Sequence, residues 1–233
     1  MNSDLKNNNI VVASPHSRND ILENNLRDYL KNYYIIRLRT PEELTIEKIK
    51  RINPKFLFFP HWSWKIPEDI YNEYECVIFH PTDLPYGRGG TPIQNLILYG
   101  HQNTQISALK CIEEYDAGPI YCKCPLSLHG TVEDILQRAS SIIEKMIIYI
   151  IRHHPRPVEQ NGKPVIFKRR NPSEGNLSEL DELNLVYDYI RMLDGDGYPK
   201  AFLETSFFHF EFFDATMSEN EISAKVYIRR KDD

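Results

Sequence analysis

Residues 55–79 (KFLFFPHWSWKIPEDIYNEYECVIF) contain two short apolar runs with a helix-forming segment between them. The runs at 55–59 and 76–79 have the length of buried strands, and residues 67–71 fit a short helix. Parallel strands need a crossover of this kind, whereas adjacent antiparallel strands need only a tight turn. This stretch therefore predicts a β-α-β unit with two parallel strands.

The same alternation continues toward the N-terminus. Apolar runs at 9–13 and 33–38 predict two more strands, and residues 20–30 place leucine and isoleucine at helical spacing. A second helix is expected to open at Thr40, because Glu43 stands at the capping-box position three residues later. Together these elements indicate an α/β fold with a Rossmann-like, mainly parallel sheet.

The rest of the chain predicts further elements and one linker. The expected helices are 91–99, 131–153 and 180–193, and the expected strands are 105–112, 119–125, 201–213 and 223–230. Prolines at 155, 157 and 164 mark the linker. We therefore expect a catalytic domain at 1–155 and a small C-terminal α+β unit at 156–233. The aromatic strands of that unit suit packing on the first domain or on a second copy in a homodimer.

The composition restricts the class of function. The 233 residues are 41% hydrophobic and carry a net charge of −5, without the basic excess of proteins that bind nucleic acid or anionic membranes. The polar start lacks the apolar core of a signal peptide, and the longest apolar run, MIIYII at 146–151, is far too short to span a bilayer. The four cysteines fit reduced structural thiols. The expected setting is cytoplasmic.

A histidine and a glycine-rich loop follow the fourth predicted strand. In open parallel sheets ligands bind at the carboxyl ends of strands, so His80 is expected to face a crevice. Residues 81–91 contain three glycines and two prolines, which requires sharp turns with exposed backbone. The alternative interpretation is a histidine that caps a strand and a turn that only connects.

A carboxylate stands in the turn between the next two predicted strands. Asp116 is followed by Ala117 and Gly118, which leave it without steric cover. Such a carboxylate can fix the tautomer of a histidine and stabilise its protonated form, so His80 and Asp116 form a candidate acid–base pair. Asp116 as a simple turn residue is the alternative.

These residues resemble the formyl-tetrahydrofolate-dependent formyltransferases. Residues 80–94 (HPTDLPYGRGGTPIQ) are similar to the HxSLLPxxRGxxPIQ element of that family, and Asp116-Ala117-Gly118 is similar to its D-x-G. The C-terminal part continues the resemblance, with KRRNPSEG at 168–175 and the IR and YPKAF pieces between residues 190 and 202. Those pieces look most like the branch that formylates nucleotide-linked amino sugars, such as UDP-linked 4-amino sugars of pseudaminic-acid-type pathways.

The resemblance implies a reaction and a set of site residues. The reaction is transfer of a formyl group from N10-formyl-tetrahydrofolate to a sugar amine for surface glycan biosynthesis, with His80 and Asp116 as catalytic residues and no metal. The residues implied on the folate side are His61, Trp62, Trp64, Ile66 and Tyr115. Those implied on the acceptor side are Arg88, Gly89, Gly90, Gln94, Lys168, Arg169, Arg170, Arg191 and Tyr198. Core packing of the tryptophans and a solvated basic turn at 168–170 are the alternatives.

One position departs from the family. The family places an asparagine two residues before the histidine, where it helps to hold the tetrahedral oxyanion, and this chain has Ile78. Loss of one oxyanion donor typically costs about a hundred- to a thousandfold in rate. The replacements expected here are protonated His80 first, then a backbone N–H within 86–90, then Gln94 and His61.

Other acceptors remain as alternatives. Methionyl-tRNA is disfavoured by charge, because residues 156–233 contain 11 Lys and Arg against 15 Asp and Glu, a net charge of 11 − 15 = −4. A small amine or water, the latter giving a formyl-tetrahydrofolate hydrolase, is a further alternative. The sequence analysis thus favours a nucleotide-sugar partner and no nucleic acid.

Overall fold

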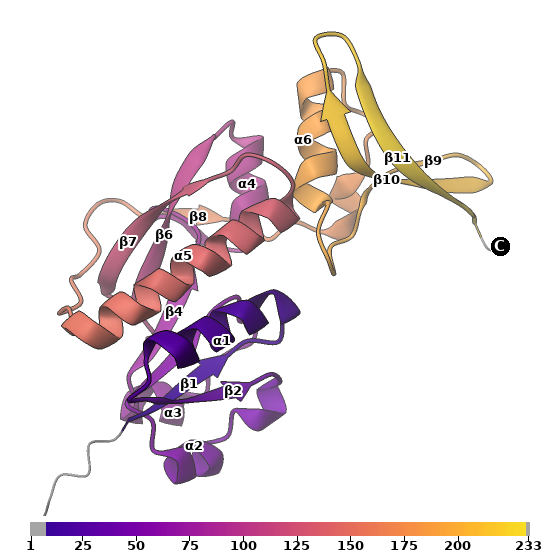
Figure 1. Cartoon of the computed structure of the whole chain (residues 1–233). Coiled ribbons are helices and arrows are strands. Elements are labelled where there is room, and N and C mark those ends of the chain that lie inside the picture. The colour runs from indigo at the N-terminus through magenta and orange to yellow at the C-terminus, as the bar shows by residue number, and fades with distance from the viewer. Residues whose placement is uncertain (1–7, 232–233) are drawn as a thin grey trace, which may run out of the picture. The chain divides into compact units, whose positions relative to one another are not determined.

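The computed structural model describes residues 8–231 and divides into two units (Figure 1). Unit 1 contains the described residues up to Arg88 together with Gln105–Pro125 and Gln137–Val165. Unit 2 contains Gly89–Thr104, Leu126–Leu136 and the described residues from Ile166 onward. Each unit therefore combines segments from several parts of the chain, whereas the sequence suggests one cut near residue 155.

A six-stranded sheet carries most of the N-terminal elements, in the strand order β2-β1-β3-β4-β6-β7. Its strands are β1 (Asn9–Ala13), β2 (Tyr34–Leu38), β3 (Phe56–Phe59), β4 (Cys76–His80), β6 (Asn103–Lys110) and β7 (Ile120–Ser127). β1, β2, β3 and β4 run parallel to one another, whereas β6 runs antiparallel to β4. The expected Rossmann-like, mainly parallel sheet is confirmed.

Helices cover both faces of this sheet. Figure 1 shows α1 on one side of β1 and β2, and α2 on the other. The helices of the N-terminal half are α1 (Asp20–Tyr29), α2 (Ile46–Ile52) and α3 (Glu68–Glu73). β3 is apolar at every position and buried throughout, because both of its faces are covered. A core cluster built around Leu57, Phe59 and Ile70 fills one side.

Unit 2 contains a second, antiparallel sheet. β9 (Ala201–Glu204), β10 (Phe208–Met217) and β11 (Ile222–Arg230) lie in the order β11-β10-β9, and α6 (Leu183–Leu193) packs on β10. The helix and short antiparallel strands expected for the C-terminal part are therefore present. The expected strand 201–213 is two strands, because residues 205–207 form a turn in which Thr205 and Phe208 hydrogen-bond to each other.

Two further details differ from the sequence prediction. The helix expected from Thr40 is a 3-10 turn at Pro41–Glu43 that keeps the predicted capping box, and α2 begins separately after its own N-cap, Thr45. The loop after β4 contains a short strand, β5 (Tyr86–Gly89), which pairs with β8 (Val165–Phe167). Period-2 patterning does not show either strand, because each has only three or four residues.

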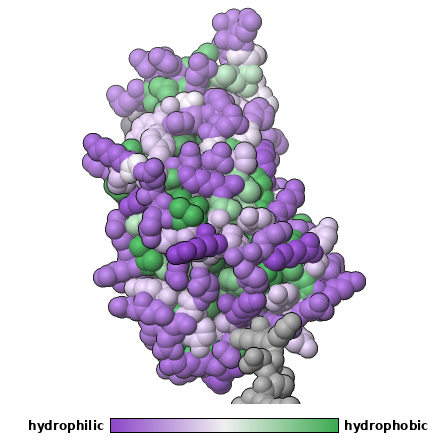
Figure 2. Space-filling model, turned by 90° about the vertical axis from the view of Figure 1, so that its left-hand side faces the viewer, coloured by the Kyte–Doolittle hydropathy of each residue, from purple (hydrophilic) through white to green (hydrophobic). Residues whose placement is uncertain are grey.

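The remaining helices are α4 (Pro92–Leu98) and the long α5 (Val132–His153). Within residues 8–231 no helix has both the length and the apolarity needed to cross a bilayer. The face drawn in Figure 2 is mostly hydrophilic, with hydrophobic residues in small groups.

Candidate active site

His80 and Asp116 lie together in unit 1. Nδ1 of His80 is 3.3 Å from Oδ1 of Asp116, and both side chains are largely buried. On the other side of the ring, Nε2 is 2.7 Å from the carbonyl oxygen of Gly87. The structure thus brings the predicted acid–base pair into contact and adds a second partner for the imidazole.

The two partners of His80 fix the orientation of its ring. Both are hydrogen-bond acceptors, the Asp116 carboxylate at Nδ1 and the Gly87 carbonyl oxygen at Nε2. The same carboxylate also acts on a neighbour: burial, and then the negative charge of Asp116, raise the pKa of the Cys111 thiol to about 11.

Asp116 reaches His80 by an unexpected route. β6 is antiparallel to β4, and its last residue, Lys110, lies opposite Val77 rather than His80. The segment after β6 must therefore return toward His80. Two unusual backbone positions make this turn: Asp116 has a φ of +54°, and a Cβ added at Gly118 would lie 1.9 Å from the carbonyl oxygen of Lys110. Only glycine fits at position 118.

Arg88 is held by side chains of unit 1. Its Nε and Nη2 donate to Oε1 of Gln160 at 3.1 and 2.8 Å, and its Nη1 is 2.9 Å from Glu114. Gln160 in turn donates to the carbonyl oxygens of Asp116 and Gly118. The guanidinium therefore anchors its own loop. Sequence reasoning missed Gln160, a lone polar residue in a linker without any local pattern.

Ile78 forms an apolar wall on the same strand face as His80. Residues two apart on a strand share a face, and Ile78 packs, half-buried, against the core cluster that contains Phe59 and Ile66. No hydrogen-bond donor replaces the family's asparagine at this position.

His61 belongs to a polar network at the carboxyl ends of β1 and β3. The amide of Asn19, which is fully buried, donates to Ser14 at 2.7 Å and lies 3.4 Å from Nδ1 of His61, while Ser140 donates to Asn19. Burial, helped by the charges of Arg18 and His16, lowers the pKa of His61 to about 3. His61 is thus neutral near pH 7, and with Nδ1 accepting, its Nε2 carries the hydrogen.

The other residues implied on the folate side differ in exposure. Trp62 is half-buried and packs edge-on against Phe59 and Trp64, and Trp64 is 43% exposed. The Nε1–H of Trp62 is buried and has no hydrogen-bond partner among the described residues. Ile66 is buried in the core cluster and anchors the 61–67 loop there. Tyr115 is exposed.

Gly89 and Gly90 form a tight backbone contact in unit 2. A Cβ at Gly89 would lie 2.6 Å from the carbonyl oxygen of Phe167, and one at Gly90 would lie 2.6 Å from Cβ of Arg169. The Asn95 side chain donates to the carbonyl oxygens of Gly90 and Lys168 at 3.0 Å each. We call Gly89, Gly90, Thr91, Asn95 and residues 167–170 the glycine clamp.

Two residues expected to bind the acceptor are buried instead. Gln94 is 3% exposed and donates to the carbonyl oxygen of Met192. Arg191 is 6% exposed, donates to the carbonyl oxygens of Leu128 and Gly130, and pairs with Asp188 at 2.6 Å. Both side chains thus hold backbone within unit 2, and their roles toward an acceptor or an oxyanion stay untested predictions.

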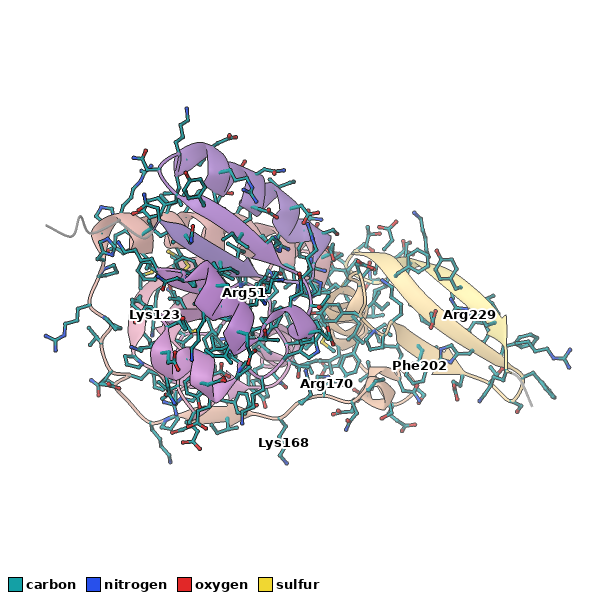
Figure 3. All side chains as sticks on the ribbon, turned by 90° about the horizontal axis from the view of Figure 1, so that it is seen from below. Arg51, Lys123, Lys168, Arg170, Phe202 and Arg229 are labelled. Atoms are coloured by element: carbon teal, nitrogen blue, oxygen red, sulfur yellow. The ribbon has the colours of Figure 1, made fainter. Side chains whose placement is uncertain are left out.

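The basic segment 168–170 presents two cations to solvent. Lys168 and Arg169 are exposed, make no ion pair among the described residues, and Lys168 extends away from the ribbon in Figure 3. Arg170 is different: it donates to the carbonyl oxygen of Glu174 and lies over the ring of Tyr189. The side chains of Lys168 and Arg169 therefore remain available to an anionic ligand.

Tyr198 lies in acidic surroundings. It lines a shallow cavity of about 470 Å³ in unit 2 together with Glu133, Asp134, Asp194, Asp196 and Lys200, which is paired with Asp194. The surplus of carboxylates disfavours a diphosphate there, and the role implied for Tyr198 stays a prediction. Among residues 8–231, no group of three or more His, Cys, Asp and Glu is placed to hold a metal ion.

Comparison with known proteins identifies the family. A methionyl-tRNA formyltransferase structure from Clostridium thermocellum is 43% identical, with a TM-score of 0.93, and the match covers 96% of this chain and 99% of that one. The chain belongs to the formyltransferase family. A family model described as methionyl-tRNA formyltransferase, C-terminal domain, matches residues 172–229. A curated methionyl-tRNA formyltransferase from Ehrlichia chaffeensis is 28% identical over 72% of this chain and 57% of its own length.

The relatives correct the expected branch of the formyltransferase family. Their names contradict both the nucleotide-sugar partner and the exclusion of a nucleic-acid partner. The physical reason is visible at Arg191: the C-terminal motif that suggested the sugar branch holds the fold of unit 2 and contacts backbone. The chain spans about half the length of the curated relatives it matches.

The formyl donor of this family is N10-formyl-tetrahydrofolate. A structure of HypX from Aquifex aeolicus in complex with tetrahydrofolic acid shares the fold, with 18% identity, a TM-score of 0.73, and coverage of 91% of this chain and 38% of that one. The chain thus shares its fold with a protein that binds a folate, and the residues of this chain that contact the formyl donor remain a prediction.

Proposed function

We propose that this chain transfers the formyl group of N10-formyl-tetrahydrofolate to the amino group of methionyl-tRNA. The observation that carries the proposal is the His80–Asp116 pair in a chain that is 43% identical, over almost its whole length, to a methionyl-tRNA formyltransferase. The acceptor is the alternative that the sequence analysis ranked below an amino sugar because of charge.

The chemistry requires a proton to pass from the amine to N10 through His80. The neutral amine attacks the formyl carbon and gives its proton to His80, the bond between that carbon and N10 breaks, and His80 returns the proton to N10. Asp116 holds Nδ1 of His80, so Nε2 is the nitrogen left for the substrate once its contact with Gly87 is exchanged. The imidazolium formed between the two transfers is stabilised by Asp116, and its positive charge stabilises the oxyanion in place of the asparagine that Ile78 replaces.

The residues of the folate-side loop fit an aromatic donor molecule. Trp62 and Trp64 offer ring surfaces for a pterin, and the unpartnered Nε1–H of Trp62 can donate to an oxygen or nitrogen of the ligand. His61 adds a neutral donor at Nε2, because Nδ1 faces the amide of Asn19. These contacts are part of the proposal.

The net charge of the C-terminal part does not decide against RNA. Binding to phosphates depends on the cations that are free to contact them, and Lys168 and Arg169 are free while most other cations of this part are paired. With two such contacts, the slope of log K against log salt is about −1.5 to −2. A shallow salt dependence is therefore expected for an RNA-binding enzyme of this charge.

The test is a direct acceptor comparison. Purified protein is incubated with N10-formyl-tetrahydrofolate and either methionyl-tRNA or a panel of small amines that includes nucleotide-linked amino sugars, and the formylated product is identified by its gain in mass. Formyl-methionine released from the tRNA is the expected result. Formylation of a small amine without formylation of methionyl-tRNA contradicts the proposal.

A further inference from the structure

We infer that Gln160 is a positioning residue for the His80–Asp116 pair, acting from the segment that follows α5. The inference rests on the proposed formyl transfer for its kinetic test. Its geometric basis lies entirely within unit 1.

The turn that carries Asp116 needs support from outside. Its φ of +54° lies in a region that non-glycine residues seldom adopt and that costs free energy unless surrounding contacts hold it. The amide nitrogen of Gln160 donates to the carbonyl oxygen of Asp116 at 2.7 Å and to that of Gly118 at 3.0 Å. One side-chain amide therefore uses both of its hydrogens to fix the turn on either side of Ala117.

The oxygen of the same amide holds the segment that contacts Nε2 of His80. Oε1 of Gln160 accepts from Nε and Nη2 of Arg88, the residue directly after Gly87. The carbonyl oxygen of Gly87 is the partner of Nε2 of His80. Gln160 thus joins the segment that holds Nδ1 to the segment that holds Nε2.

The orientation of the amide is determined by its partners. A rotated amide would place Oε1 against two carbonyl oxygens and the NH2 group against a guanidinium, which is unfavourable on both sides. The backbone also fixes the position of Gln160: Val158 forms an antiparallel bridge with Ile120, with hydrogen bonds of 2.7 and 2.9 Å. Gln160 is therefore rigidly placed by hydrogen bonds to other groups of the protein.

Two substitutions separate the contacts of the amide nitrogen of Gln160 from those of its oxygen. Gln160→Ala removes both ends, whereas Gln160→Glu keeps the acceptor for Arg88 but places a carboxylate against the carbonyl oxygens of Asp116 and Gly118. We expect kcat to fall about 10- to 30-fold in each variant, because a shift of about 1 Å at a reacting group costs up to a hundredfold. KM for the folate is expected to stay near that of the wild type, whereas the melting temperature should fall modestly because the carbonyl oxygens of Asp116 and Gly118 lose their donor. Glu159→Ala, at the exposed neighbouring residue, is the matched control and should leave kcat unchanged.

A double-mutant cycle distinguishes positioning from general stabilisation. If Gln160 acts through Asp116, Gln160→Ala lowers kcat less than threefold in the Asp116→Asn background, because the group to be positioned is already lost. The imidazole ¹⁵N shifts of His80 give a readout that needs no acceptor: they should change in Gln160→Ala and not in Glu159→Ala.

The outcomes separate this inference from the proposed function. A kcat of Gln160→Ala within twofold of the wild type, an undiminished effect in the Asp116→Asn background, or unchanged His80 ¹⁵N shifts would each overturn the inference. If the wild type formylates no methionyl-tRNA, the proposed function fails, and the ¹⁵N shifts still decide whether Gln160 positions His80.

Discussion

The His80–Asp116 pair and the glycine clamp use the same structural device for different ends. Both depend on a glycine where a Cβ would collide with another segment, Gly118 against Lys110 in one case and Gly90 against Arg169 in the other. In unit 1 the close approach of backbone brings two ionisable side chains into contact. In unit 2 the side chain of Asn95 is used to hold the backbone, and Lys168 and Arg169 remain turned to solvent.

The difference shows that a motif can mix chemical and architectural residues. Residues 80–94 form one continuous element of the sequence, but His80 belongs to the pair that we propose to react, whereas Gln94 is buried and donates to the carbonyl oxygen of Met192. Substitutions of residues like His80 should therefore change the rate of formyl transfer, and substitutions of residues like Gln94 should change the free energy of unfolding.

Asp116→Asn should give the largest effect. The amide keeps the shape of the carboxylate but cannot stabilise the imidazolium of His80, so we expect kcat for formyl transfer to fall about 10²- to 10⁴-fold. Steady-state kinetics and a thermal melt check this, and the melting temperature should change little. A turnover within threefold of the wild type would show that this pair is not the catalytic centre.

Arg191→Met tests the architectural side of the comparison. The change leaves Asp188 and two buried carbonyl oxygens without their partner, so the free energy of unfolding should fall by about 3–5 kcal/mol. Urea denaturation measures this fall. The exposed Arg230 provides the matched control, since Arg230→Met removes the same guanidinium and should change stability by less than about 0.5 kcal/mol. An equal loss of stability in Arg191→Met and Arg230→Met would show that the contacts of Arg191 do not hold the fold of unit 2.

Alanine at the two tight glycines should separate the regions directly. Gly118→Ala and Gly90→Ala each force backbone apart, which costs about 1–3 kcal/mol of stability. Gly118→Ala is also expected to lower kcat, because it displaces the turn of Asp116, whereas Gly90→Ala should leave kcat near the wild type while the protein stays folded. Gly197→Ala is the comparison without a steric clash: its Cβ meets nothing within 4 Å, so only its φ of +76° opposes the alanine. A larger loss of kcat in Gly90→Ala than in Gly118→Ala would reverse the assignment.

His61 should give the smallest effect near neutral pH, because its contribution to stability changes only in acid. Its pKa is about 3 in the folded protein and about 6.5 when unfolded, so the unfolded chain binds one more proton between these values. Stability then falls as pH drops from about 6.5 toward 3, by up to about 1.4 kcal/mol per pH unit. His61→Asn should reduce this slope by that amount in urea titrations at pH 4 to 6. An unchanged slope would show that His61 is protonated in the folded state.

The sequence predicts the fold well where patterns are long or repeated. The sequence shows β1, β3 and β4 as apolar runs, because both faces of these strands are buried. It shows α5 as an amphipathic segment, because one face of the helix is buried. The division of the 201–213 stretch and the direction of β6 are not visible, because they depend on pairing between segments that local pattern does not encode.

The candidate site could be predicted only in part. His80 and Asp116 are found because each follows a strand in a motif with characteristic neighbours. Gln160 is missed because its partners lie 42 to 72 residues away and the linker has no period. The hydrogen bonds of Arg191 and Gln94 to backbone carbonyl oxygens are missed as well, because a sequence does not reveal whether a charged or amide side chain faces a ligand or a buried carbonyl.

The most direct test of the central claim is a single-turnover measurement. Excess wild-type protein and excess His80→Ala protein are each mixed with N10-formyl-tetrahydrofolate and methionyl-tRNA, and formyl-methionine is quantified over time after quenching. The account predicts rapid formylation by the wild type and a rate constant at least about a hundredfold lower for His80→Ala. Equal rate constants for the two proteins would contradict it.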